Sequence, residues 1–534
     1  MKKNSIVLLI FLISIGINAW AQQPTFGLLK SDANAADGYT LFTPQFNNAV
    51  FLIDNCGEKI NEWTFSETPG LSCYLLENGN LLRAGNDSLE IRAWDNTLLW
   101  SYAMTDNTLL QHHDIEPMPN GNILCVVTDR YSDTIAISAG RNPANLGATI
   151  RLERIVELEP IGTNDANIVW EWKFYDHLIQ EFDSTKLNFG VVANDPGLLD
   201  FNFSNNQNVD FIHLNAVDYN EDLDQIMFSS KHLHEIYIVD HSTTILEAAG
   251  HAGGNSNKGG DFLWRWGNPQ VYQQGSSADQ LLFDQHDCKW IPSSFPDSGK
   301  VSVFNNNGDG TETFSSIHIL TPDFVDNAYT MSLNKFLPST YDWSWNGSIL
   351  GNVVHENKKC GAQVLSNGNV LFCESSSGRI SEITRSGDHL WSYRNPTHSG
   401  GAIFNQYEIV PGQTMTIFRG ERYDPNHPGL AGQDLTPQGI IEDQNSLSES
   451  CILGTDESSL ASSIWVINPI QDNMLRFNSI IKADNITIVN MVGQVVVEWS
   501  NFHGKTLPFQ SKLGAYFIRI SKDGNEMNQK IIVQ

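Results

Sequence analysis

Short hydrophobic runs rich in β-branched and aromatic residues alternate along most of the chain with polar stretches that contain Asn-Gly or Asp-Gly. These dipeptides favour the positive φ angles of tight hairpin turns, so the pattern predicts strands joined by hairpins. The 3.6-residue periodicity of amphipathic helices is nearly absent. One hairpin phrase, with Asn-Gly-Asn at its centre, occurs at residues 75–82, 116–124 and 364–371. The pattern therefore predicts an all-β fold class.

A second phrase, in which tryptophan or tyrosine alternates with polar residues, ends several of these units, at residues 99–102, 169–172, 263–266 and 390–393. A hairpin, a further strand and a Trp-bearing strand in regular succession are typical of propeller blades. The interpretation is a six-bladed β-propeller over residues 23–455, with the tryptophans in the blade cores. Roughly 70 residues per blade exceed the ~40–50 of compact repeats, which predicts long insertions, with 131–150 and 176–210 as candidates. A pair of β-sandwiches is the alternative.

Residues 1–21 have the pattern of a secretory signal peptide. Two lysines precede an apolar run at 6–17, and Ala19-Trp20-Ala21 supplies a small-x-small cleavage site. The alternative, a transmembrane anchor, is disfavoured because the run is too short to span a bilayer, and no other stretch is long enough. The pattern predicts export through the periplasm to the cell surface or medium.

Composition narrows the possible partners. The 534 residues include 61 acidic and 32 basic side chains, for a formal net charge of −29. Nucleic acid and anionic membrane surfaces need clustered lysine and arginine, so the charge argues against both. The seven cysteines are too sparse for a disulfide scaffold and form no CxxC pair. An odd count leaves at least one thiol free in an exported protein, and pairing, including that of Cys56 with Cys73, stays open.

The composition and the hydrophobic pattern of the sequence change after about residue 455. A Ser-rich linker precedes a short β module with Asn468-Pro469 at its start, an N-x-x-G-Q turn at 490–494 and G-x-Y-F-I-x-I at 514–520. Residues 456–534, linker included, resemble the C-terminal sorting domain of the type IX secretion system. The resemblance implies a small β-sandwich-like domain that engages the type IX secretion machinery. An ordinary β appendage that assists binding is the alternative.

Histidines gather beside predicted blade strands, at residues 112–113, 213, 232–234 and 286. A propeller directs the first strand of every blade at one central channel, so residues far apart in sequence converge there. His213 and Asn215 are two apart, which a regular strand would place on one face. A metal site is one interpretation, although no HExxH motif or paired-carboxylate ligand set accompanies the histidines. The other interpretation is a neutral imidazole nucleophile surrounded by hydrogen-bond donors that stabilise an anionic group during its transfer.

Several of these segments resemble the arylsulfate sulfotransferase family. The resemblance runs through most of 40–430, and its densest part includes 210–219, 225–232 and Phe283-Asp284-Gln285-His286-Asp287. It implies a six-bladed propeller that moves a sulfuryl group from a phenolic sulfate ester to a phenol acceptor. The family uses no nucleotide sulfate donor (PAPS-independent), so no cofactor is expected.

The resemblance also implies roles for individual residues. His286 matches the family's nucleophile, which becomes a sulfohistidine, and His113, His213 and Asn215 match its channel-lining donors. Lys231 stands where the family commonly has arginine, which keeps the charge but loses the two-pronged donor. His113 is preferred to His112 because alternation in a strand places His113 on the same face as Ile115. The competing hypothesis is a non-catalytic secreted propeller that binds glycans or proteins; oligomeric state is not predicted.

Overall fold

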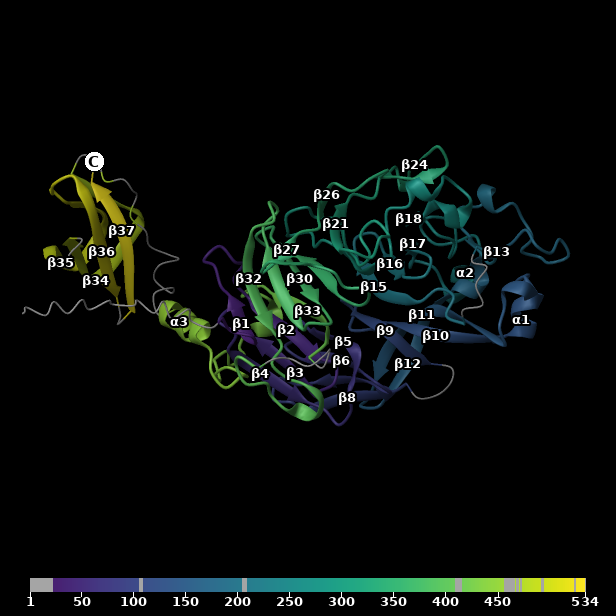
Figure 1. The fold of residues 1–534 in the computed structure, drawn as a ribbon, viewed down its shortest axis with the longest axis horizontal. Coiled ribbons are helices and arrows are strands. Elements are labelled where there is room, and N and C mark those ends of the chain that lie inside the picture. The colour runs from purple at the N-terminus through teal and green to yellow at the C-terminus, as the bar shows by residue number, and fades with distance from the viewer. Residues whose placement is uncertain are drawn as a thin grey trace, which may run out of the picture.

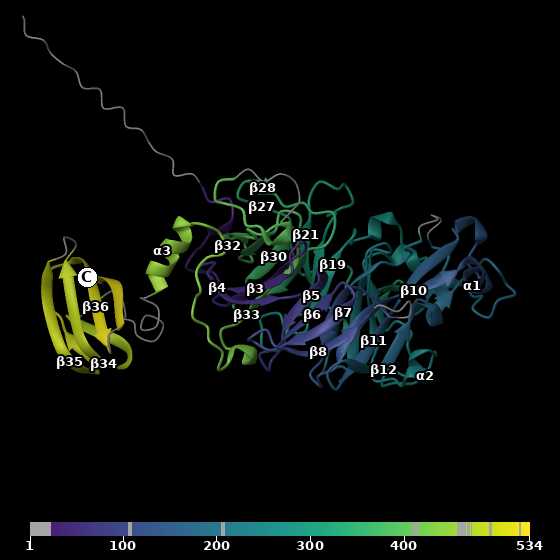
Figure 2. The same cartoon turned by 90° about the horizontal axis from the view of Figure 1, so that it is seen from below.

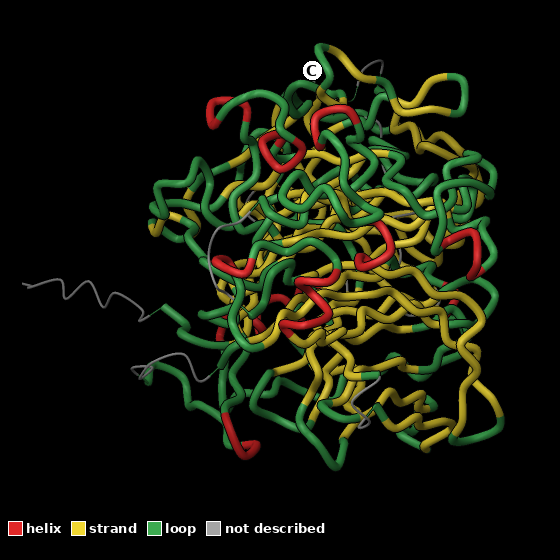
Figure 3. Tube along the Cα trace, turned by 90° about the vertical axis from the view of Figure 1, so that its right-hand side faces the viewer, coloured by secondary structure: helices red, strands yellow, loops and turns green. Residues whose placement is uncertain are grey.

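The computed structural model describes residues 23–104, 109–203, 209–408, 415–455, 466, 470, 473–490, 494–522 and 525–533. The predicted signal peptide lies outside the described residues, as does most of the predicted linker. Strands and loops make up nearly all of the described chain, and helical segments are few and short (Figure 3). The all-β prediction is therefore confirmed.

The first half of the body forms three antiparallel sheets, each built from strands that are largely consecutive in sequence. The innermost strand is the first one named in each of the first two sheets and the last one named in the third. The sheets are β33 (Ile417–Tyr423), β2 (Tyr39–Pro44), β3 (Ala49–Ile53) and β4 (Lys59–Thr64); β5 (Pro69–Leu75), β6 (Leu81–Gly85), β7 (Ser88–Arg92) and β8 (Leu98–Ala103); and β12 (Asp165–Lys173), β11 (Thr149–Ile161), β10 (Ile123–Ser132) and β9 (Leu110–Pro117).

Three further antiparallel sheets follow, and the last of them gains a fifth strand from the N-terminal end of the described chain. They are β15 (Leu214–Asn220), β16 (Gln225–Ser230), β17 (Glu235–Asp240) and β18 (Trp264–Trp266); β19 (His286–Trp290), β20 (Val301–Asn305), β21 (Ser316–Leu320) and β26 (Trp343–Trp345); and β29 (Gly361–Val364), β30 (Val370–Glu374), β31 (Arg379–Ile383), β32 (His389–Arg394) and β1 (Gly27–Lys30).

The six innermost strands close a ring. β5 contacts β9, β9 contacts β15, β15 contacts β19, β19 contacts β29, and β33 contacts both β29 and β5. Figure 1 shows β5, β9, β15 and β33 meeting in the middle of the body. Two strand pairs connect the N-terminal and C-terminal parts of the propeller: β33 pairs with β2, and β1 pairs with β32. A ring of radial antiparallel sheets is a β-propeller rather than a pair of β-sandwiches.

Indole hydrogen bonds connect each sheet of the body to the next one. The outer-strand tryptophans are buried or half-buried, as predicted, and one in each sheet donates its Nε1–H to a backbone carbonyl of the following sheet or its loops. The six bonds, at 2.7–2.9 Å, run from Trp63 to Ala93, Trp100 to Asp165, Trp172 to Gly260, Trp264 to Leu337, Trp343 to Arg385 and Trp391 to Asn55.

The Asn-Gly phrases join the first and second strands of three sheets. Gly79, Gly121 and Gly368 adopt φ angles of 83°, 87° and 87°, the left-handed region that favours glycine. The predicted insertions also lie between strands: 133–148 separates β10 from β11 and carries helix α1 (Asp133–Ser138), and 178–213 separates β12 from β15. A further insertion at 245–263 carries helix α2 (Ile245–Ala248).

Two elements follow the last propeller strand. Helix α3 (Ser446–Thr455) is joined to the loop after β3 by a disulfide between Cys451 and Cys56, with the Cα atoms 5.5 Å apart. The other five cysteines are free and buried. Beyond α3 (Figure 2) lies a four-stranded sheet with its own apolar core. Its order is β35 (Val495–Pro508), β34 (Met474–Asn490), β36 (Gly514–Lys522) and β37 (Asn525–Val533).

Candidate active site

Irregular inner strands bring three predicted site histidines to the axis. His113 lies in β9, His213 directly precedes β15, and His286 begins β19. The pairing register of each strand shifts beside its histidine, which marks a bulge. His113 and His213 have φ angles of 63° and 57°, uncommon for residues other than glycine. Strained backbone of this kind clusters at functional sites, where it aims a side chain that a regular strand would direct elsewhere.

The histidine rings form a contiguous cluster. Ring centroids are 4.1 Å apart for His112 and His113, 4.7 Å for His113 and His213, and 5.1 Å for His112 and His213. A fourth ring, that of His232, lies 4.8 Å from the ring of His213. Both His112 and His113 therefore belong to the site, and the strand alternation used to choose between them is interrupted by the bulge.

Hydrogen bonds orient the imidazole of His286. Its Nδ1 lies 2.8 Å from Asn306 Oδ1 and 3.0 Å from the carbonyl oxygen of Asp284. The Asn306 amide nitrogen donates to the carbonyls of Glu356 and Lys359, which turns its oxygen toward His286. Nδ1 therefore carries the proton, and the lone pair is on Nε2. The residue is 1% exposed, and burial lowers the pKa of His286 to about 3, so the imidazole is neutral at neutral pH.

His213 is paired with a half-buried carboxylate, that of Asp210. Its Nδ1 lies 2.5 Å from Asp210 Oδ2, and Asp210 also accepts a hydrogen bond from Arg151 Nε at 3.1 Å. Burial opposes the charge of Asp210, but the hydrogen bonds from His213 and Arg151 outweigh it and hold the pKa of the carboxyl below its usual range. A carboxylate in this position orients the imidazole, because it fixes Nδ1 toward Asp210 and leaves Nε2 without that partner.

Lys231 carries the positive charge of the site. It follows β16 in a turn, and its backbone N–H donates to the carbonyl of His213 at 3.0 Å. The charges of His213 and Lys231 both contribute to the lowered pKa of His286, after the larger effect of burial. Among the described residues no carboxylate lies within ion-pair distance of the Lys231 ammonium group. The cation is therefore available to an anionic ligand.

Asn215 is buried more deeply than His213. It is fully buried, and its amide nitrogen donates to the carbonyl of Gln285 at 2.7 Å. His213 keeps a side-chain exposure of 19%, so the two residues do not share one environment as regular alternation predicts. Asn215 holds the backbone next to His286 and is a positioning residue in this structure.

Arg419 connects three inner strands through residues that lie close to the site histidines in sequence. Its guanidinium lies 2.9 Å from Asp114 and 3.0 Å from Asp287, which follow His113 and His286 in sequence. It also donates to the carbonyl of Asn215 at 3.0 Å. Burial opposes the charge, but the two carboxylates hold the pKa of Arg419 well above its usual range. The sequence alone does not predict this role of Arg419, because its three partners come from three different strands.

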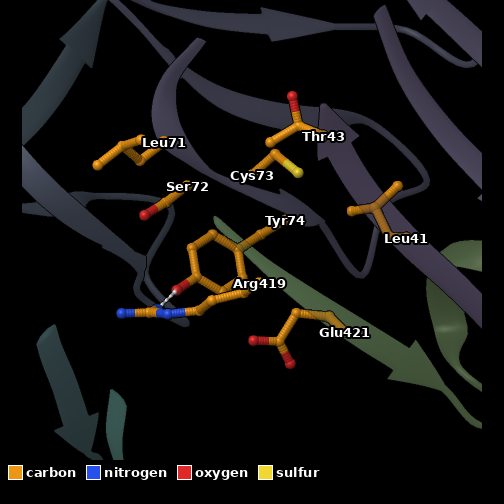
Figure 4. Close-up of a pocket in the computed structure, with 8 residues that line it drawn as sticks. All are labelled: Leu41, Thr43, Leu71, Ser72, Cys73, Tyr74, Arg419 and Glu421. Atoms are coloured by element: carbon orange, nitrogen blue, oxygen red, sulfur yellow. Dashed lines mark hydrogen bonds between the residues drawn. The ribbon is translucent and has the colours of Figure 1, made fainter. Parts of the chain in front are cut away.

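Two cavities lie along the inner strands beyond this ion-pair layer. Figure 4 shows the smaller, in which Arg419 reaches the hydroxyl of Tyr74; its described lining contains none of the predicted site residues. The larger is lined by Glu116, Asp218 and Glu421, with Lys289 paired to Glu421. Burial raises the pKa of Asp218 to about 7. The three carboxyl groups of this cavity outnumber its single lysine. An anionic ligand is therefore better accommodated beside Lys231 and the histidine cluster than in this cavity.

The arrangement combines the groups that anionic group transfer requires. His286 is neutral with its lone pair on Nε2, His213 and Asp210 are in hydrogen-bond contact, and Lys231 supplies a cation. Fixed donors of this kind replace the hydration of a charged group during transfer.

Comparisons with solved structures give three similar chains. The chain resembles a protein of unknown function from Bacteroides caccae, with TM-score 0.38 and 11% identity over 73% of this chain and 100% of the other. It also resembles virginiamycin B lyase from Staphylococcus aureus, with TM-score 0.34 and 10% identity over 74% of this chain and 98% of the other. The Cps50 (Swd1) β-propeller domain of Myceliophteria thermophila gives TM-score 0.35 and 8% identity over 70% of this chain and 91% of that domain.

A search of curated proteins gave no match. In contrast, residues 31–320 match the family model described as Arylsulfotransferase (ASST). The matched region contains His113, His213, Asn215, Lys231 and His286. It spans more than half of the chain, and the chain therefore belongs to the arylsulfotransferase family, whose members are sulfotransferases.

Proposed function

We propose that the protein transfers a sulfuryl group from a phenolic sulfate ester to a phenol acceptor, through a sulfohistidine at His286 and without a nucleotide sulfate donor. The observation that carries the proposal is the buried neutral imidazole of His286, whose Nδ1–H is held by Asn306 so that Nε2 is the nucleophile. The family and the cation at Lys231 support an anionic sulfate donor.

In the first step the Nε2 lone pair of His286 attacks sulfur, and the bond between sulfur and the phenolic oxygen breaks. The electron pair leaves with the phenolate, which takes a proton from Nε2 of protonated His213. Asp210, 2.5 Å from Nδ1 of His213, stabilises that imidazolium before transfer. Lys231 and His113 hold the sulfuryl oxygens, whose charge changes as the bonds exchange.

In the second step an acceptor phenol gives its proton to Nε2 of His213 and attacks the sulfur atom. The bond between nitrogen and sulfur breaks, and its electron pair returns to His286. The cycle moves one proton from acceptor to donor oxygen and leaves every residue as it began. Two-step transfer of this kind produces ping-pong kinetics.

We infer that the protein acts outside the cytoplasm. The apolar run and cleavage pattern of residues 1–21 support a signal peptide, and the sequence of 456–534 supports a type IX sorting module. The Cys56–Cys451 disulfide fits an oxidising compartment. Among the described residues no helix has the length and hydropathy needed to span a bilayer.

The test is a mass measurement on the His286 peptide after brief exposure of the protein to a chromogenic aryl sulfate. We expect an increment of one SO₃ on that peptide, with dye release that depends on added phenol and disappears in His286→Ala. His427→Ala is the matched control, since His427 lies outside the cluster and bonds to Gly429. Release that continues without acceptor would indicate a sulfatase. No turnover with any donor and acceptor would favour the glycan- or protein-binding alternative.

A further inference from the structure

The proposed reaction leaves two members of the histidine cluster unused. His112 lies next to His113 and His213, and His232 lies against His213. One nitrogen each from His112, His113 and His213 lie within 4.8 Å of one another. Tetrahedral zinc with bonds of about 2.0–2.1 Å places ligand nitrogens about 3.4 Å apart, so small side-chain rotations bring these three into range. Three imidazoles at this spacing form a ligand set.

In two histidines of the cluster, His112 and His213, the Nδ1 atom lies close to a carboxylate. His213 Nδ1 is hydrogen-bonded to Asp210 Oδ2 at 2.5 Å, and His112 Nδ1 lies 3.0 Å from Glu153 Oε1 without hydrogen-bond geometry. Ligating histidines usually direct one ring nitrogen to a carboxylate or a carbonyl, which leaves the other for the ion. Glu153 is fully buried and is fixed by a hydrogen bond from the Leu214 backbone at 3.2 Å. The third histidine, His113, has a buried Nδ1 without a hydrogen-bond partner among the described residues.

A second histidine group in the chain does not have this arrangement. His177 and His251 both lie near Asp261. His177 already uses Nδ1 on Asp261, at 3.0 Å, and Nε2 on the carbonyl of Ala248, at 2.8 Å. No lone pair of His177 remains for an ion. This group serves as an internal comparison.

We propose that His112, His113 and His213 bind one Zn²⁺ ion, with the fourth coordination position open, and that Zn²⁺ reversibly blocks sulfuryl transfer. Zinc accepts three histidines and an open position readily, and the carboxylates of Glu153 and Asp210 offset its charge. The blocking effect rests on the proposed function, because the ion takes nitrogens that would otherwise hold the sulfuryl group and its proton. Binding of the ion does not depend on the reaction.

The experiment titrates the purified full chain with Co²⁺, whose visible absorption reports tetrahedral coordination, and then with Zn²⁺ as competitor. We expect one site per chain. His112→Ala should weaken Zn²⁺ binding at least about 10-fold, and Asp210→Asn, which keeps all three ligands, about 10–100-fold. His251→Ala should bind as the wild type does. Thermal unfolding of each variant confirms that it is folded.

The proposal is overturned if the wild type binds no Zn²⁺ at a tenfold excess, or if folded His112→Ala binds as tightly as the wild type. Loss of binding in His251→Ala alone would place the ion at the second group and also overturn it. Transfer assays with Zn²⁺ form the second arm, in which inhibition is expected and is relieved by a chelator. A chain that binds Zn²⁺ here but transfers no sulfuryl group from any ester retains the metal site and loses the proposed function; transfer without Zn²⁺ binding gives the reverse.

Discussion

The hydrogen-bond partners of His286 Nδ1 determine which ring nitrogen can act as the nucleophile. Two acceptors, Asn306 Oδ1 and the carbonyl of Asp284, hold the Nδ1 proton, and burial keeps the ring neutral. A solvent-exposed histidine would exchange between tautomers and accept a proton near its ordinary pKa. The structure therefore removes both ways in which an imidazole loses its nucleophilic nitrogen.

Replacing Asn306 tests this orientation. In Asn306→Ala the acceptor of the Nδ1–H is lost, and we expect His286 sulfation to slow about 10–100-fold, as for other supporting partners of functional histidines. Rapid-mixing mass spectrometry of the His286 peptide measures that rate. Asn307→Ala is the control, because Asn307 directs its amide to Asp284 Oδ2. Equal slowing in both folded variants would show that orientation by Asn306 is not the cause.

Lys231 tests the role of charge. Lys231→Met removes the cation near His286, and we expect the first step to slow about 10²–10³-fold, the usual effect of losing one stabilising donor. Lys231→Arg should retain most of the rate, because it restores the positive charge. Lys258→Met, on an exposed loop, should have no effect. Stopped-flow dye release gives the rates, and a Met variant as fast as the wild type would remove Lys231 from the site.

At the scale of elements, bulges and indole bonds act together. Bulges at β9, β15 and β19 direct the histidines to one point. The tryptophan hydrogen bonds fix the spacing between neighbouring sheets, so inner strands of different sheets keep their separation. Local irregularity is useful here only because the sheets that carry it are held in place.

β26 contains a matched pair of residues for this element. Trp343 donates its indole N–H to the Arg385 carbonyl at 2.9 Å, whereas Trp345 packs against Phe372 with the rings tilted by 47° and has no indole hydrogen bond among the described residues. Both are half-buried. Trp343→Phe should lower the free energy of unfolding by about 1 kcal/mol more than Trp345→Phe, the value of one hydrogen bond. Urea denaturation measures both, and an equal loss would assign the indole bond no net contribution.

At the scale of the whole molecule, the ring is closed by strands from both ends and by a covalent link. β33 completes the first sheet, β1 extends the last, and Cys56–Cys451 links α3 to the loop after β3. The disulfide spans 395 residues, so it restricts the unfolded chain strongly.

Cys451→Ser should therefore lower the unfolding temperature, with a loss of about 2–5 kcal/mol. Differential scanning calorimetry with and without reductant checks this. Reductant should lower the unfolding temperature of the wild type and leave that of Cys451→Ser unchanged. A variant that remains as sensitive to reductant as the wild type would show that the disulfide is not the source of the effect.

The sequence by itself determined the all-β class, the hairpins at Asn-Gly and the burial of the tryptophans, because these follow from turn conformation and side-chain chemistry over a few residues. It also indicated His113, His213, Lys231 and His286 through their resemblance to a family. Tertiary structure alone decided the rest. Bulges break the alternation that related His213 to Asn215, and the propeller brings Asn306 to His286 and Arg419 to Asp114 from distant positions. Cys56 pairs with Cys451 and not with Cys73 for the same reason: ring closure sets which residues meet, and no local pattern encodes it.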